Sequence, residues 1–339
     1  MRNTKLSGAV RSTLSRAAGM LGTVDPALYI GRAIDEAFDL PIGDSRYRRN
    51  TLSPGAAPLE PSFSEVEPYG LRFTMEPLGP DASAGMKRQE VSHQMRQIVG
   101  PIFGSDALYW FDRMSEDFRG PVGGAGLRFG GWYGAAFDRD GIYNSRAFYE
   151  IRDAQLDDLQ RPLRDHIQRA REAFPRLRPL FLMLSVRQTT GRQKVTFRVM
   201  GPVRVEDLRP LLAALGLENR MAQLTRLFGL ALGGMFEAPD GAILIGISDG
   251  PDGPELDIEL LIAAIAEVPE SFVELLRLGL AERPRHLRAL DHWVGAFTPP
   301  GERLPGDFSV LSISLTRGSP AQVGLYLRPM GFEIAEQMT

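Results

Sequence analysis

The segment that decides the fold reads Tyr69-Gly70-Leu71-Arg72-Phe73-Thr74-Met75-Glu76-Pro77. Apolar and polar residues alternate along it, and successive side chains of a β-strand point to opposite faces. The segment therefore predicts a strand with one apolar face and one charged face. The charged face carries Arg72, Thr74 and Glu76.

The same alternation recurs downstream in four pairs of predicted strands. They cover about 127–137 with 143–151, 180–187 with 194–199, 242–248 with 255–261, and 308–316 with 322–328. Because the turns within each pair are short, we expect antiparallel hairpins. Helical spacing predicts helices between the pairs, over about 85–117 (with a break near Gly100-Pro101), 156–174, 204–234 and 261–290.

Repeated hairpins separated by helices indicate one structural unit used several times. We expect the apolar strand faces to pack against helices and the polar faces to line a central chamber. Hairpins repeated around a ring can close into a barrel, which removes exposed edges. The strand pattern alone fits this barrel and an open α+β sheet with its polar face toward water equally well. Five units with one consistently polar face favour the closed form.

The N-terminal part has a different composition. Residues 1–40 follow helical spacing, with a second helix starting at Asp25-Pro26. Residues 40–68 are rich in proline and predict an irregular segment, although they include Pro58-Leu59-Glu60-Pro61-Ser62-Phe63. We expect residues 1–54 to form a helical segment packed on a barrel of residues 55–339, within a single domain.

Composition argues against several classes of protein. A net charge of −3 is unlike that of a general nucleic-acid binder. The absence of cysteine excludes disulfides and thiolate metal sites. No apolar run is long enough to span a membrane, and the basic N-terminus lacks the pattern of a secretory signal. The expectation is a soluble cytoplasmic protein without nucleic-acid or membrane partners. The four scattered histidines predict no metal site.

Basic side chains gather on the predicted inner face of the strands. A confined cluster of this kind suits a diphosphate, because arginine binds its oxygens in pairs and lysine adds a point charge. For any single arginine, a salt bridge to an acidic residue of the same face is the favoured alternative. The basic residues are Arg72, Arg146, Lys194 and Arg198, with Arg187 and Arg328 as further candidates, and the acidic ones are Glu76, Glu150, Asp257 and Glu259.

Aromatic residues share this face. Phe148 and Tyr326 point inward, together with either Trp132 or Tyr133. Aromatic faces stabilise cations, so the chamber could shelter an allylic carbocation beside its diphosphate. Each ring alone is more often part of the packing.

Residues 71–80, followed by Tyr109-Trp110-Phe111, resemble the dimethylallyltryptophan synthase family of aromatic (indole) prenyltransferases. Four further places match in order: 58–62, 137–138 with 146–148, 184–186 with 194–196, and 322–329. The resemblance covers about 55–330 and is to members of bacterial size. It implies a ten-stranded antiparallel barrel of five αββα-type units, ringed by helices, with the active site in the lumen.

The resemblance also implies roles for single residues. Glu60 would take the indole N–H proton as a ring carbon attacks the allylic cation, although it could instead only cap a turn. Arg72, Arg146 and Lys194 would hold the diphosphate, with Arg198 beside them. Tyr326 would shield the cation.

The sequence departs from the family pattern at five positions of the expected substrate pocket. Phe148 and Arg198 each stand where the family has tyrosine, and Thr196 stands where it has lysine. Asp257 and Glu259 replace neutral residues. Two carboxylates would repel a diphosphate unless a divalent ion or a cationic acceptor lies between them.

The leading hypothesis is transfer of a dimethylallyl or longer group from its diphosphate to an indole or tryptophan acceptor, by electrophilic aromatic substitution. No cofactor is expected to be required, with Mg²⁺ at most stimulatory. The alternatives are a barrel prenyltransferase acting on a peptide or phenolic acceptor and a non-catalytic barrel that carries a ligand. The protein is expected to be a monomer or a homodimer.

Overall fold

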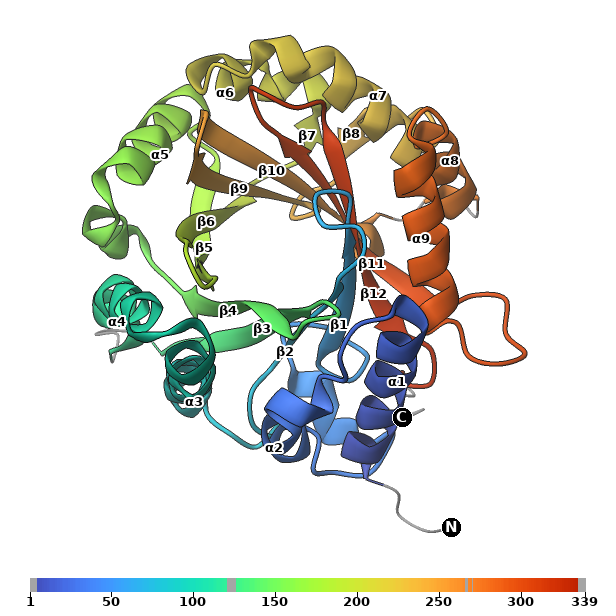
Figure 1. Cartoon of the computed structure of the whole chain (residues 1–339). Coiled ribbons are helices and arrows are strands. Elements are labelled where there is room, and N and C mark those ends of the chain that lie inside the picture. The colour runs from blue at the N-terminus through green and yellow to red at the C-terminus, as the bar shows by residue number, and fades with distance from the viewer. Residues whose placement is uncertain (1–4, 121–125, 266–267, 270, 335–339) are drawn as a thin grey trace.

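The structure, a computed structural model, describes residues 5–120, 126–265, 268–269 and 271–334. In this part of the chain, ten strands close into one antiparallel barrel (Figure 1). These strands are β1 (Leu59–Ser64), β2 (Leu71–Met75), β3 (Gly131–Phe137), β4 (Ile142–Glu150), β5 (Leu177–Val186), β6 (Gly191–Val199), β9 (Ile243–Gly250), β10 (Gly253–Leu261), β11 (Gly306–Leu315) and β12 (Gln322–Pro329). The short strands β7 (Val203–Arg204) and β8 (Glu237–Ala238) form a separate two-stranded sheet.

The helices surround the barrel, as Figure 1 shows. They are α1 (Leu6–Leu21), α2 (Ala27–Ala37), α3 (Ala84–Ile98), α4 (Ser105–Arg119), α5 (Arg161–Ala173), α6 (Arg209–Ala214), α7 (Met221–Ala231), α8 (Phe272–Gly279) and α9 (Pro284–Phe297). The predicted break near Gly100-Pro101 is confirmed, since a π-helical turn at Val99–Phe103 separates α3 from α4. The order of hairpins and helices therefore follows the sequence prediction.

Each barrel strand pairs with the barrel strands before and after it in the chain, and β1 pairs with β12 to complete the ring. All of these pairings are antiparallel, as expected for short connections. In the closing pair, Ser62 lies opposite Tyr326. The closed α+β barrel is thus confirmed over the open sheet.

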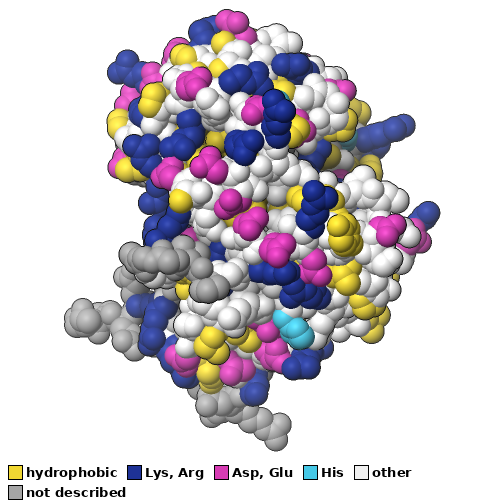
Figure 2. Space-filling view, turned by 90° about the vertical axis from the view of Figure 1, so that its left-hand side faces the viewer, with side chains coloured by type: hydrophobic (Ala, Val, Ile, Leu, Met, Phe, Trp, Pro, Cys, Tyr) yellow, Lys and Arg dark blue, Asp and Glu magenta, His cyan; other side chains and the backbone are white. Residues whose placement is uncertain are grey.

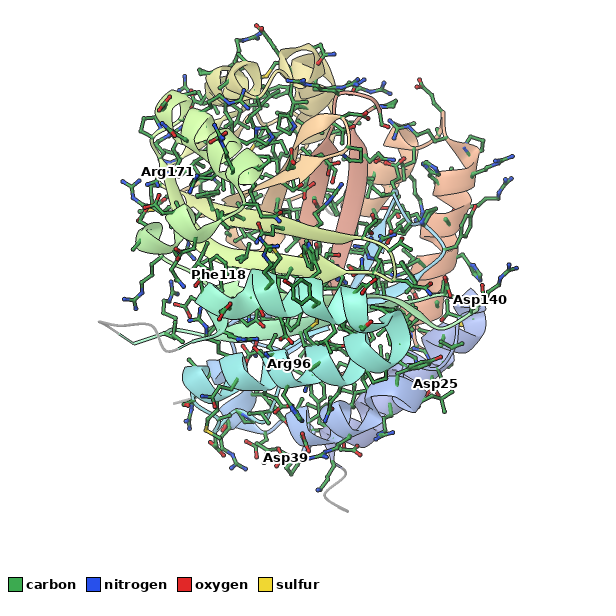
Figure 3. The ribbon with its side chains drawn as sticks, turned by 60° about the vertical axis from the view of Figure 1, so that its left-hand side comes forward. Asp25, Asp39, Arg96, Phe118, Asp140 and Arg171 are labelled. Carbon is green, nitrogen blue, oxygen red and sulfur yellow. The ribbon has the colours of Figure 1, made fainter. Side chains whose placement is uncertain are left out.

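The two faces of the strands have separate environments. Leu71, Phe73 and Met75 of β2 are fully buried in the hydrophobic core outside the barrel wall. Figure 3 shows α3 and α4 lying across the strands, and Phe118 of α4 is buried in the same core. Burial of apolar surface at about 25 cal/mol per Å² makes this layer the main source of stability. The polar strand faces remain inside the ring.

The prediction of an irregular segment over residues 40–68 is wrong in its last part, because β1 occupies Leu59–Ser64. The strand is hard to recognise in the sequence because proline lacks the backbone N–H that a strand donates to its neighbour, so prolines argue against a strand. Pro61 pairs with Phe73 of β2, whereas the pairing of β1 with β12 starts only at Ser62. The proline therefore lies where β1 is paired on one side.

No helix among the described residues is long and apolar enough to cross a membrane.

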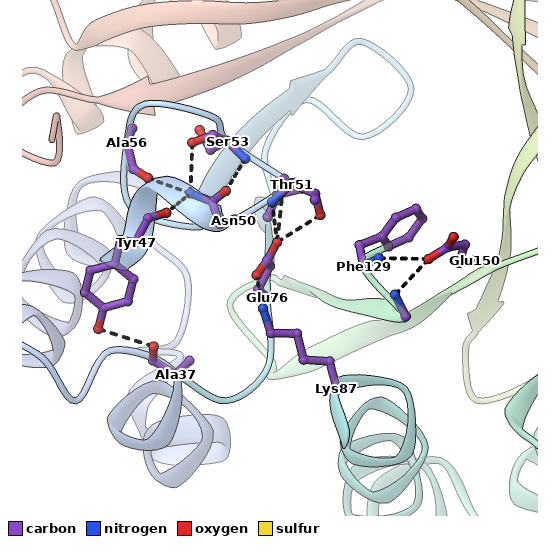
Figure 4. Close-up of polar contacts among 12 residues, drawn as sticks. Ala37, Tyr47, Asn50, Thr51, Ser53, Ala56, Glu76, Lys87, Phe129 and Glu150 are labelled. Carbon is purple, nitrogen blue, oxygen red and sulfur yellow. Dashed lines mark hydrogen bonds and ion pairs between the residues drawn. The ribbon is translucent and has the colours of Figure 1, made fainter. Parts of the chain in front are cut away.

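The segment before β1 is fixed by one buried side chain. The Asn50 amide nitrogen donates to the carbonyl oxygens of Tyr47, Ser53 and Ala56 at 2.6, 3.2 and 2.8 Å, and its oxygen accepts from Ser53 N–H at 2.7 Å (Figure 4). Asn50 is 5% exposed.

Replacing this side chain (Asn50→Ala) should lower the free energy of unfolding by about 3 kcal/mol, because buried backbone groups lose their partners. Urea unfolding followed by circular dichroism measures the loss. The exposed Asn219 gives the matched control, and Asn219→Ala should stay within about 0.5 kcal/mol of wild type. Equal stability of the two variants would contradict the role given to Asn50.

Candidate active site

The barrel encloses a cavity of about 1290 Å³. All ten barrel strands contribute inward side chains to its wall, because alternate residues of a strand face the lumen. On β2, for example, Arg72 and Thr74 line the cavity. The polar strand face predicted from the sequence is therefore the wall of a chamber.

Nearly all of the predicted site residues meet at this chamber. Those on its wall are Glu60, Arg72, Arg146, Phe148, Lys194, Arg198, Asp257, Glu259 and Tyr326. Arg187 and Arg328, the two further candidates, also line it. Thr196 does not line it, since this side chain is fully buried within the wall opposite Phe181 and Gly246.

Arg72 and Arg146 form the core of a basic region in the chamber. Burial, reinforced by the charge of Arg72, lowers the pKa of Arg146 to about 10. The nearest carboxylate is Glu67, whose Oε2 lies 3.6 Å from Arg72 Nη1 and accepts a hydrogen bond from Tyr143 at 3.0 Å. Glu67 is also paired with Arg187. One carboxylate is thus shared by two guanidinium groups, those of Arg72 and Arg187.

Several guanidinium nitrogens of the chamber are buried without a hydrogen-bond partner among the described residues. They are Nε of Arg72, Arg146, Arg198 and Arg328. A buried donor without a partner is costly, and a buried charge more so. Four such groups around one cavity therefore indicate a site for an anion with several acceptor oxygens.

Lys194 has a different environment from these arginines. Its Nζ lies 2.9 Å from Asp257 Oδ2 and 3.8 Å from Glu259 Oε1. Burial alone would lower the pKa of Lys194, but the two carboxylates outweigh it and raise the pKa above its ordinary value. For Lys194 the salt-bridge alternative considered in the sequence analysis therefore holds.

Glu60 lies on β1 opposite Thr74, in the same chamber. Its side chain is buried, and burial raises the pKa of its carboxyl to about 7, while the nearby Ser309 hydroxyl and Arg328 charge limit the rise. A carboxyl with a pKa near neutrality can exchange a proton at physiological pH. This makes Glu60 the candidate base of the site.

An aromatic cluster forms another part of the wall. Trp132 stacks on Phe129 at 4.3 Å between ring centroids and meets the edge of Phe181 at 5.4 Å, and Phe181 lies 5.6 Å from Phe148. Of the two rings considered from the sequence, Trp132 lines the cavity, whereas Tyr133 packs in the outer core. Sequence reasoning missed Phe129 and Phe181, although alternation in β5 could have identified Phe181.

Glu76 and Glu150 were predicted to be possible salt-bridge partners for the inner arginines, and this is wrong. Glu76 accepts hydrogen bonds from Thr51 N–H at 2.7 Å and Leu52 N–H at 3.3 Å and pairs with Lys87 (Figure 4).

Glu150 likewise binds backbone groups. It accepts from the N–H groups of Arg128, Phe129 and Gly130 at 2.8, 2.8 and 3.0 Å. Thr51, Leu52, Arg128 and Phe129 all line the cavity, so the two carboxylates fix two segments of its wall. Neither glutamate neutralises the arginines.

Figure 2 shows one outer face of the molecule, where acidic and basic side chains are interspersed. No large area of a single charge covers this face, in contrast to the concentrated basic groups of the chamber. A ligand attracted by positive charge would therefore bind inside the barrel rather than on this face.

No protein-family model and no curated protein sequence matches this chain, but solved structures do. A 6-dimethylallyltryptophan synthase from Micromonospora olivasterospora, in complex with DMASPP and Trp, has a TM-score of 0.72 and 17% identity over 98% of this chain and 100% of that one. For the 5-dimethylallyl tryptophan synthase from Streptomyces coelicolor, in complex with the same compounds, the values are 0.74 and 15% over 99% and 98%.

A third match, AnaPT from Neosartorya fischeri, has a TM-score of 0.61 and 13% identity over 88% of this chain and 85% of that one. At such low identity these similarities concern the fold. They confirm the fold expected from the sequence resemblance: the chain has the helix-ringed barrel of the dimethylallyltryptophan synthases.

The raised pKa of Glu60 has a consequence for stability. Because the folded pKa of about 7 lies above the ordinary value of 4.5, the folded state binds more protons between these pH values, and stability falls as the pH rises through them. Removing the charge (Glu60→Gln) should therefore stabilise the free protein by about 3 kcal/mol at pH 8 and by less than about 1 kcal/mol at pH 5.

Urea unfolding of both proteins at the two pH values measures this difference. Glu116→Gln, which removes an exposed carboxylate on α4, is the control and should change stability little at either pH. A stability gain for Glu60→Gln that is the same at pH 5 and pH 8 would show that Glu60 has an ordinary pKa.

Proposed function

We propose that this protein is an aromatic prenyltransferase that moves a dimethylallyl group from its diphosphate to an indole or tryptophan-type acceptor. The observation that carries the proposal is the group of buried, unpartnered guanidinium nitrogens in the same chamber as the Glu60 carboxyl. The fold adds support, because two of the similar structures above are dimethylallyltryptophan synthases in complex with DMASPP and Trp.

In the proposed reaction, the bond between the allylic carbon and the diphosphate oxygen breaks, and both electrons leave with the diphosphate. Arg72 and Arg146 stabilise the charge that develops on the leaving oxygens, since fixed donors act strongly in a chamber of low dielectric. Arg198 and Arg328 are further donors with unpartnered nitrogens. Tyr326 and Phe148 face the cationic allylic group with their rings.

The acceptor ring supplies the electron pair for the new carbon–carbon bond. Glu60 takes the indole N–H proton during the attack and returns it to nitrogen when the substituted ring carbon loses its own proton, which leaves with the diphosphate. A pKa of about 7 suits this role, because the carboxylate and the acid are both populated near neutral pH.

The reaction proposed here needs no cofactor, because guanidinium groups can neutralise the leaving diphosphate, and Mg²⁺ is at most stimulatory. The site is proposed to work in a cytoplasmic monomer or homodimer. Lys194 is left out of the diphosphate ligands because Asp257 already neutralises it.

The second hypothesis, prenyl transfer to a peptide or phenolic acceptor, differs from the first in the acceptor that is consumed. The third hypothesis, a barrel that only carries a ligand, differs from both because such a carrier releases no diphosphate. Separate incubations of dimethylallyl diphosphate with free tryptophan, a tryptophan-containing peptide and a phenol should give diphosphate release with free tryptophan, whereas release only with the peptide or the phenol would favour the second hypothesis. No release with any acceptor would refute the proposed function.

The variant Glu60→Gln should reduce kcat by at least about 100-fold while the Kd for inorganic diphosphate changes less than about threefold, because it removes the base and keeps the basic groups. Turnover is measured by product formation and binding by calorimetry. In the wild type, kcat/KM should rise with pH through about 7 as Glu60 loses its proton. Unchanged turnover in the variant would refute the role of Glu60 as the base.

The variant Arg146→Gln should weaken binding of inorganic diphosphate by at least about tenfold, since a charge-assisted contact contributes about 1.5–3 kcal/mol. Arg139→Gln, which removes a charge from the exposed turn after β3, should leave the Kd unchanged. Equal affinities of these two variants would place the anion site elsewhere.

A further inference from the structure

Glu67 is a carboxylate of the chamber to which the proposed reaction gives no role. It lies in the loop between β1 and β2 and lines the cavity, and its side chain is 20% exposed. The turn between β5 and β6 lies at the same end of the barrel, because neighbouring strands of the ring run in opposite directions. Glu67 therefore stands at the end of the chamber where the strands of each hairpin are joined.

Two donors hold the Glu67 carboxylate in place. Arg187, just after β5, donates to its Oε1, and the Tyr143 hydroxyl donates to its Oε2 at 3.0 Å. The Arg187 guanidinium also lies over the Tyr143 ring, 5.6 Å from the ring centroid. Burial would raise the pKa of Glu67, but the charge of Arg72 and the bond from Arg187 outweigh it and keep the pKa below its ordinary value. Glu67 is therefore a charged acceptor at neutral pH.

The same carboxylate holds Arg72 much more loosely. Arg72 Nη1 lies 3.6 Å from Glu67 Oε2, which is longer than a normal hydrogen bond. Burial and the charge of Arg72 lower the pKa of Arg146, whereas the charge of Glu67 opposes them. The buried Nε atoms of Arg72 and Arg146 have no hydrogen-bond partner among the described residues. Glu67 thus neutralises part of the charge of both arginines and leaves donors of both free.

We infer that Glu67 is a counter-ion that competes with diphosphate for Arg72 and Arg146 and so limits how tightly diphosphate binds. The inference rests on the proposed function, in which diphosphate is first part of the donor and then a product that has to leave. A diphosphate bound to these arginines lies close to the Glu67 carboxylate, and like charges repel one another strongly in a chamber of low dielectric. The repulsion weakens the complex without removing any of its donors.

Two other roles for Glu67 predict the opposite effect on binding. If Glu67 positioned Arg72 for the anion, loss of its charge would weaken diphosphate binding. The separation of 3.6 Å argues against this role, because a carboxylate that orients an arginine makes short, paired hydrogen bonds to it. If Glu67 held a divalent cation for the diphosphate, its loss would weaken binding only with Mg²⁺ present. Arg187 already supplies positive charge at Oε1, where such a cation would have to bind.

The test is calorimetric binding of inorganic diphosphate at about pH 7.5, once in EDTA and once with Mg²⁺. In EDTA, Glu67→Gln should bind diphosphate at least about tenfold more tightly than the wild type, a gain of about 1.4 kcal/mol.

Glu255→Gln is the matched control for loss of one negative charge. Glu255 also lines the cavity at this end of the barrel and is bonded to an arginine, Arg192. Its charge is not among those that act on Arg146. The Kd of Glu255→Gln for diphosphate should therefore change less than about threefold, since like charges repel less at longer range.

Tyr143→Phe tests the same contact from the other side. Tyr143 is not among the described residues that line the cavity, so we expect its hydroxyl to act on the diphosphate through Glu67. Without this hydroxyl, Glu67 keeps its charge but loses a donor, and Arg72 is the nearest replacement. Diphosphate binding should weaken about threefold or more, since a hydrogen bond contributes about 0.5–1.5 kcal/mol. In the Glu67→Gln background the same substitution should have no effect.

Unchanged or weaker diphosphate binding by Glu67→Gln in EDTA overturns the inference. So does a tightening of equal size in Glu255→Gln, because any lost negative charge would then have the same effect. A loss of affinity in Glu67→Gln that appears only with Mg²⁺ also overturns it. Should Glu67→Gln fail to fold, Tyr143→Phe decides alone: diphosphate binding that is unchanged or tighter overturns the inference.

The outcome is distinguishable from that of the proposed function, because calorimetry needs no turnover. Diphosphate release from the prenyl donor, together with unchanged binding by Glu67→Gln, would refute this inference alone. Tighter binding by Glu67→Gln without release in any mixture of donor and acceptor would refute prenyl transfer and leave the counter-ion role of Glu67 standing. Where both hold, the inhibition constant of diphosphate as a product should fall in Glu67→Gln by the same factor as its Kd.

Discussion

Pairing between β1 and β12 is the interaction on which the chamber depends. It joins Ser62, Phe63 and Ser64 to Tyr326, Leu325 and Gly324 and so completes the hydrogen-bonded ring. The same pairing brings Glu60 near Arg328 and places Tyr326 in the same wall. Glu65, fully buried just after β1, reinforces the closure by accepting from Val323 N–H at 2.8 Å and from Arg283 at 2.7 Å. The pairing of β1 with β12 therefore both closes the ring and positions Glu60, the candidate base.

Within this ring, the charges fall into groups with different degrees of neutralisation. Lys194 and Asp257 are bonded to each other, and Arg192 is bound by Glu255 through two hydrogen bonds. Arg72 lies 3.6 Å from the Glu67 carboxylate, and both Arg72 and Arg146 keep an Nε without a partner among the described residues. Buried charges that lack partners lower the stability of a protein. Such charges are retained where a bound ligand supplies the opposite charge. The groups that are incompletely neutralised therefore locate the ligand sites better than a count of charged residues would.

Much of the fold was predictable because strand alternation has a fixed period and short turns restrict pairing. The period identified the inward positions of Arg72, Arg146 and Lys194. It failed where irregularity intervenes: Pro61 hid β1, and beside a register shift between Pro179 and Phe181 the neighbours Leu180 and Phe181 both line the cavity. Facing inward also did not ensure access, since Thr196 is covered within the wall.

The sequence predicted which residues belong to the site better than it predicted which of these residues contact one another. Alternation placed Lys194 and Asp257 on one face, but their contact depends on the lateral order β6–β9–β10, which a sequence does not display. Glu76 and Glu150 had the right residue type for partners of arginine, yet backbone N–H groups of segments distant in sequence take their oxygens. The resemblance to a known family identified Glu60, because a carboxylate in a proline-rich segment has no distinguishing pattern of its own.

Closure of the barrel by its first and last strands sets the timing of its assembly. During synthesis β1 is the first barrel strand to emerge, while β12, which must pair with its free edge, is the last barrel strand to be made. Until then, the edge is available to wrong partners, and the contact that forms last in the ring spans nearly the whole sequence. Until β12 has been made, the hairpins can already be folded but the closed interior does not yet exist, so ligand binding can begin only after this last strand has joined the ring.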